Sequence, residues 1–432
     1  MDKKLSLGIS AALLLSAPLA TAMSDAEIEK RFQMYEERIK VLETELNSLK
    51  SSGKSPLVNK LQKQISKNKK RADKKLTKLS KKLSNVSERM KINGFMTAAV
   101  SMADDDLGTS YNFTDKPNFK GDSKVGLQLD YKVGESTKAT IQLLARSRSA
   151  ESWQVDAEWA YLSHDFSDST TARMGRLRIP FYMYSETIDV GYSYPWVRPP
   201  IEMYTTEITS YDGADVRYRF NIGDWNNDIQ FFGGGSGETD STSTNLVDLT
   251  DLWGTVVTGN YGDFTLRGMA THISIRDAGV NAISVDDDFS YYSVGAEWNS
   301  QDWLVITEGA YFKAENGILF PDFANHYITA GKRIGNGMPF MTYAASYSHH
   351  EPDFPVYYGI LNPTQSHFAG KSVSLGFRQE VTSSVAMTVQ WDHFFEFADS
   401  GGSFDFGGIG QSAPSELGNK TNIYTLSFDT VF

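Results

Sequence analysis

The 432-residue sequence predicts an all-β transmembrane barrel of about 16 antiparallel strands, preceded by an α-helical coiled-coil segment. Apolar and polar residues alternate with a period of two from Ile92 to the C-terminus, and short turns alternate with long connections. No stretch after residue 22 approaches the roughly 18 consecutive apolar residues of a membrane helix. Because barrel strands present only one apolar face, a mean hydropathy of -0.36 is compatible with a membrane barrel.

Residues 1–22 have the three parts of a cleavable secretory signal. Lys3 and Lys4 precede an apolar run from Leu5 to Leu19, and Ala20-Thr21-Ala22 follows it. We expect cleavage after Ala22 and a mature chain without a transmembrane helix. The alternative is a buried N-terminal helix.

Residues 23–91 predict two helical pieces. From Ile28 to Leu49, apolar residues recur in steps of four and three, which is the heptad repeat of a coiled coil. A second helical pattern runs from Leu57 to Met90, with Asn68 in its apolar seam and a stutter after it. We therefore expect these helices to associate, as a dimer or a higher oligomer.

The helical segment is also strongly basic. Residues Lys54 to Lys91 carry a charge of +12 and residues 1–53 carry -1, which leaves -22 for the body from Ile92 out of a net charge of -11. One interpretation is a solvated coiled-coil face, and the other is contact with an anionic surface, such as peptidoglycan or lipid phosphates. The secretory signal argues against nucleic acid as the partner. The chain has no cysteine, which excludes disulfides and thiolate chemistry.

Residues 92–432 predict the barrel. Sixteen segments have strand periodicity, at 92–103, 124–134, 137–149, 152–166, 170–180, 213–222, 225–235, 250–260, 263–275, 288–299, 302–313, 325–336, 338–349, 370–381, 384–396 and 419–432. An even strand count places both ends of the barrel on the same side. In the last segment, Tyr424, Leu426 and Phe428 share one face, and the chain ends on Phe432. We expect this segment to pair with the first strand and close the barrel.

Barrels of this size are wide enough to leave an aqueous channel. The third long connection, 181–212, is the candidate for a segment that folds inward and narrows the channel, because it is rich in acids, aromatic residues and proline. Strand parity directs a set of arginines toward the same space. The candidate pore residues are Arg146, Arg148, Arg176, Arg178, Arg217, Arg219, Glu186, Asp189, Glu202 and Glu207. Acids facing arginines would create a transverse field that discriminates ions. The alternative is that these charges merely solvate a wide lumen or an external loop.

Together, the signal, the sixteen alternating strands, the acidic third loop opposite arginines and the terminal Phe432 resemble the general diffusion porins of Gram-negative outer membranes. Gly175-Arg176-Leu177-Arg178-Ile179-Pro180-Phe181 is the most family-like stretch. The preceding helical segment looks like that of porins with a periplasmic coiled coil. The resemblance implies passive transport of small hydrophilic solutes and ions, a homotrimer in the lipid bilayer, and an N-terminal segment in the periplasm. It also implies that the barrel-assembly machinery recognises Phe432. The run Pro195-Trp196-Val197-Arg198-Pro199-Pro200 departs from the usual porin loop.

Nothing in the sequence indicates an enzyme. It lacks G-x-S-x-G, H-E-x-x-H and phosphate-binding glycine motifs, and we expect no cofactor and no metal site. His349-His350 heads a long connection and is more typical of a loop surface than of a metal site. Two alternatives to a channel remain, a structural tether between outer membrane and cell wall, and, less favoured, an outer-membrane hydrolase.

Overall fold

The computed structural model describes residues 88–104, 113–148, 151–204, 209–236, 246–278, 284–315, 322–348, 369–397 and 420–432, with scattered positions between 37 and 77. The chain divides into two units, Met1–Asn85 and Val86–Phe432. In the first unit, the described positions are helical and exposed. The heptad residues and the signal segment lie outside the described residues, so the coiled coil and the cleavage site stay predictions. In the described part of the chain, no helix is both long and apolar enough to cross a membrane.

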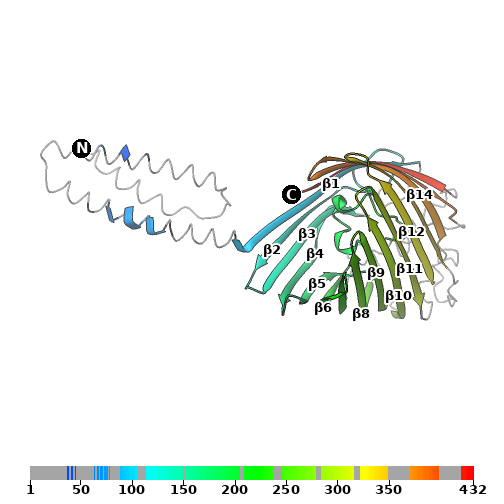
Figure 1. Cartoon of the computed structure of the whole chain (residues 1–432), viewed down its shortest axis with the longest axis horizontal. Coiled ribbons are helices and arrows are strands. Elements are labelled where there is room, and N and C mark those ends of the chain that lie inside the picture. The colour runs from blue at the N-terminus through cyan, green and yellow to red at the C-terminus, as the bar shows by residue number, and fades with distance from the viewer. Residues whose placement is uncertain are drawn as a thin grey trace. The chain divides into compact units, whose positions relative to one another are not determined.

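The second unit is a closed barrel of sixteen antiparallel strands, each paired with its neighbours in sequence order (Figure 1). The strands are β1 (Met90–Ala103), β2 (Lys124–Lys132), β3 (Thr137–Arg148), β4 (Glu151–Asp165), β5 (Thr170–Arg178), β6 (Ser210–Ile222), β7 (Trp225–Ser236), β8 (Leu246–Tyr261), β9 (Phe264–Ala278), β10 (Ser284–Asn299), β11 (Trp303–Ala314), β12 (Phe323–Lys332), β13 (Gly337–Ser348), β14 (Ala369–Thr382), β15 (Val385–Phe395) and β16 (Lys420–Val431). The predicted antiparallel barrel and its strand count are confirmed.

The last strand closes the barrel against the first, as expected. The ladder runs from Phe95 opposite Val431 to Ala103 opposite Ile423. Beyond it, the backbone N–H of Gly94 donates to the carbonyl of Phe432 over 2.7 Å, and the N–H of Phe432 donates back over 2.9 Å. The Phe432 ring lies so close to Gly94 that a Cβ there would be 2.2 Å from a ring carbon. A side chain at position 94 would therefore displace the Phe432 ring from this arrangement.

The two faces of the wall differ in chemistry. Outward-facing residues are large and apolar, and Tyr424, Phe428 and Val389 are each more than 40% exposed. Their inward-facing neighbours, such as Ser427 and Thr388, are buried. This alternation gives the barrel the apolar outer belt that a hydrocarbon environment requires.

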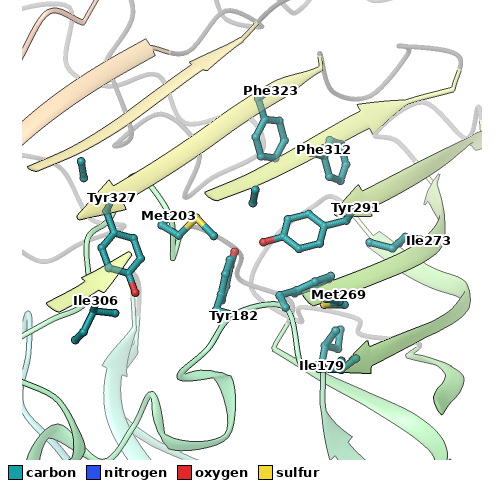
Figure 2. Packing of buried hydrophobic residues seen from close by; sticks show 14 of the residues in the cluster. Ile179, Tyr182, Met203, Met269, Ile273, Tyr291, Ile306, Phe312, Phe323 and Tyr327 are labelled. Atoms are coloured by element: carbon teal, nitrogen blue, oxygen red, sulfur yellow. The ribbon is translucent and has the colours of Figure 1, made fainter. Parts of the chain in front are cut away.

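The inner face is more apolar than strand alternation alone suggests. Inward-facing Ile273, Tyr291 and Ile306 belong to a buried cluster contributed mainly by strands β7 to β13. Tyr182 and Met203, from the segment between β5 and β6, pack against it (Figure 2). The apolar lining is therefore the docking surface for an internal segment and is removed from water by it.

Candidate functional site

The described part of the segment between β5 and β6, residues 179–204 and 209, lies inside the barrel, and we call it the inner loop. It contains two short 3-10 helices, η2 (Ser185–Thr187) and η3 (Gly191–Ser193). Glu186 bonds to Arg217 on β6, whereas the Tyr192 hydroxyl donates to Glu380 on β14 over 2.9 Å. Strands β6 and β14 stand eight places apart in the closed ring of sixteen, so the inner loop contacts opposite walls.

Two arginines and two acids form a closed, buried ring between the inner loop and strands β3, β4 and β5. Arg146 donates to Asp189 over 3.0 Å and to Glu158 over 3.1 Å. Arg178 donates to Glu158 over 2.9 Å and also bonds to Asp189. Each carboxylate thus meets both guanidinium groups, and the ring has no net charge. Arg178, Glu158 and Asp189 are almost completely buried, which is tolerable for charged groups only because they are paired.

A second set of charges adjoins the first. Arg173 Nε lies 3.0 Å from both oxygens of Asp215, and Arg173 Nη2 lies 3.2 Å from Glu186 Oε1. Glu186 also meets Arg217, and the Gln230 amide donates to Asp215 over 2.7 Å. Burial opposes ionisation of Glu186, but Arg217 and Arg173 outweigh it and lower the pKa of this carboxyl below its ordinary value. This set is also neutral, and Glu186 is its most exposed member.

The structure brings together five of the predicted pore residues, Arg146, Arg178, Arg217, Glu186 and Asp189. It places the others elsewhere or does not describe them. Arg219 donates to the backbone carbonyl of Asp168 at an exposed turn. Arg176 is on β5 opposite Asp212, and Glu202 lies at the other end of the inner loop. Glu207 and the side chain of Arg148 lie outside the described residues.

Acids of the inner loop face arginines of the wall, and the two sets of charges are in direct contact. The reason is physical, since charges covered by a docked loop lose their hydration and are stable only as close pairs. Four arginines and four acids therefore cancel locally, and the field of this cluster is short-ranged.

Sequence reasoning missed Glu158, Arg173 and Asp215. Arg173 and Asp215 oppose each other on β5 and β6 and share the inward parity of Arg217, so strand register could have revealed them. Glu158 follows no simple parity, because the pairing of β3 and β4 shifts by one residue beside it.

Further polar contacts fasten the other half of the inner loop. Arg378 on β14 donates to the carbonyls of Tyr194 over 2.7 Å and Tyr192 over 3.0 Å. The indole N–H of Trp196 donates to Thr342 over 2.9 Å. The bonds from Arg378 satisfy loop carbonyls, the bond to Thr342 satisfies the indole N–H, and together they hold the loop as a defined structure. In the described residues, no group of three or more His, Asp or Glu is placed to hold a metal ion.

A barrel with an apolar outer face and a polar loop crossing its interior has the architecture of transmembrane porins. Three solved structures share the fold, each covering 79% of this chain. They are the outer membrane channel DcaP of Acinetobacter baumannii (14% identity, 97% of that chain, TM-score 0.53), an anion-selective porin from Comamonas acidovorans (12%, 99%, 0.53) and OmpF of Salmonella typhi with daunomycin (12%, 97%, 0.54). No family model and no curated protein matches the sequence. The similarity to these three structures therefore establishes the barrel fold of this chain.

Proposed function

We propose that this protein is an outer-membrane porin, a water-filled channel through which small hydrophilic solutes and ions diffuse passively. The observation that carries the proposal is the inner loop, whose Glu186 and Tyr192 contact walls on opposite sides of a barrel with an apolar belt. A barrel acting only as an anchor would need no charged loop bound across its interior. Two of the three fold relatives are by name an outer membrane channel and an anion-selective porin, which supports the same interpretation.

In this proposal, the inner loop narrows the channel, and the charge cluster lies at the constriction. Arg146, Arg217 and Glu186 keep about a quarter to a third of their side-chain surface exposed, so they are the members of the cluster that a passing solute meets. Because the cluster is neutral, we infer weak ion selectivity, with the -22 charge of the body favouring cations at the channel mouths.

The proposal extends to assembly and location. We infer a homotrimer, since a trimeric form is printed for a fold relative, OmpT of Vibrio cholerae (13% identity, TM-score 0.51). We further infer cleavage of the signal, a periplasmic N-terminal segment that binds peptidoglycan through its lysines, and recognition of Phe432 by the barrel-assembly machinery. The protein is not an enzyme in this proposal.

Planar-bilayer recording tests the function directly. The purified full-length protein should produce stepwise conductance, and a salt gradient should give a reversal potential of small magnitude. Liposome swelling in small sugars is the companion measurement. Absence of both conductance and swelling, from protein whose barrel is folded, would leave the tether as the better function. Hydrolysis of phospholipid micelles would instead identify a hydrolase.

A further inference from the structure

A buried carboxylate lies in the inner loop, away from the charge cluster. Glu202 sits in a turn in which the N–H groups of Met203 and Tyr204 donate to the carbonyl of Pro200 over 3.1 Å and 3.0 Å. Its exposed fraction is 0%, and its carboxylate oxygens receive no well-formed hydrogen bond from the described residues, with the Ser372 hydroxyl as a weak polar neighbour. An ionised carboxylate in such a place is costly, so the group takes up a proton or a counterion.

Glu202 lines a small cavity between the inner loop and the inner faces of β14 and β15. Ser372 and Ser374 reach the cavity from β14, and Gln390 and Asp392 reach it from β15. The loop itself adds Trp196 and Arg198 to the lining. Strand β14 thus offers only neutral hydroxyls, and no cation on either strand lines the cavity beside Glu202.

Arg198 does not neutralise Glu202, because other acids occupy its guanidinium. It donates to Asp392 over 2.6 Å and to Asp122 over 2.9 Å and 3.0 Å. The charged groups that surround the cavity therefore include two acids for one arginine before Glu202 is counted. A negative charge on Glu202 would therefore have no cation to compensate it, and protonation of the Glu202 carboxylate removes that charge.

We propose that Glu202 is a proton-binding site that locks the inner loop onto β14 and β15, and that loss of the proton loosens this end of the loop. If the protein is the channel proposed above, the lock makes its constriction respond to pH. The site itself does not depend on that function, because it concerns the docking of the loop.

The direction in which pH changes the docking of the loop follows from the shift in the pKa of Glu202. Burial raises the pKa of Glu202 to about 7, and the charge of Asp392 adds to the rise. A carboxyl whose pKa is higher when docked binds its proton more tightly in the docked loop. Docking is therefore strongest below the ordinary pKa of glutamate and weakens about tenfold per pH unit up to about pH 7, where the effect levels off.

The absence of native cysteines allows a direct test of docking in the full-length protein. Ser374→Cys places a thiol in the cavity, where the docked loop shields it from a water-soluble thiol reagent. Labelling rates are measured from about pH 4.5 to 8, with Glu202 and with Glu202→Gln in the same reporter background. The ratio of the two rates at each pH cancels the chemistry of the thiol. Ser372→Cys is the second reporter should Ser374→Cys not fold.

We expect the ratio to rise about tenfold per pH unit and to reach a plateau above about pH 7. Glu202→Asp, which keeps a carboxyl, should retain the rise. A ratio that does not change with pH overturns the proposal. A midpoint that shifts when sodium, magnesium or calcium replaces a bulky organic cation also overturns it, because a metal cation would then be the ligand.

Conductance separates this proposal from the proposed function. A channel should change conductance over the same pH range with Glu202 and not with Glu202→Gln. If the labelling rate of the cysteine reporter depends on pH but no conductance is seen at any pH, the result supports the lock and contradicts the channel. Conductance with labelling that is independent of pH supports the channel and contradicts the lock.

Discussion

Replacing Arg178 by methionine should destabilise the protein more than any other single change in the charge cluster. The guanidinium of Arg178 is 3% exposed and bonds to both Glu158 and Asp189. Its loss leaves two buried carboxylates with Arg146 alone and changes the ring from neutral to a charge of -1. Removing one partner of a buried ion pair costs about 3–5 kcal/mol.

The assay is equilibrium urea unfolding in lipid vesicles, followed by tryptophan fluorescence. Arg219→Met is the matched control, because the Arg219 side chain donates to an exposed backbone carbonyl and its loss should change the free energy of unfolding by less than about 0.5 kcal/mol. The double variant Arg178→Met with Glu158→Gln restores neutrality and should recover a large part of the loss. Equal effects of Arg178→Met and Arg219→Met would refute the buried ring.

Three further outcomes are expected. Gly191→Val should lift the inner loop from the wall, because a Cβ at Gly191 would lie 2.1 Å from Asp429 Oδ1. Faster proteolysis of the loop would show this displacement. The control is Gly268→Ala, which should change the proteolysis rate little because a Cβ at Gly268 would have nothing within 4 Å. Deleting Phe432 should slow barrel assembly, measured by heat-modifiable electrophoresis, and an unchanged rate would contradict its role as an assembly signal. Glu186 should stabilise the docked loop above the ordinary pKa of glutamate, and this stabilisation is lost as pH falls through the lowered pKa of Glu186 in the folded protein. Glu186→Gln should therefore speed loop proteolysis at neutral pH, and the proteolysis rates of the variant and the parent should converge in acid.

The strands could be predicted because strand periodicity is a local property. An outward residue such as Val389 and an inward one such as Gln390 differ in polarity at adjacent positions, so the sequence carries their direction. The period also directed Arg146 and Arg217 inward. These assignments needed no knowledge of distant parts of the chain.

The partners of those arginines could not be predicted in the same way. Glu158 enters the ring through a shift in pairing between β3 and β4, and Asp189 reaches it from the inner loop, whose path depends on contacts around the whole barrel. The apolar inner surface was missed for a similar reason. Residues such as Ile273 and Ile306 look like lipid-facing residues until the loop that covers them is placed.

The position of η3 has a consequence for the order of folding. The inner loop approaches the wall where Thr97 on β1 donates to Asp429 on β16 over 2.6 Å, a bond between residues 332 positions apart. That docking surface does not exist until the first and last strands have met, which is a slow, non-local event. The contacts of η3 with this part of the wall therefore form only after closure, and a loop seated at Gly191 is a signature that closure is complete.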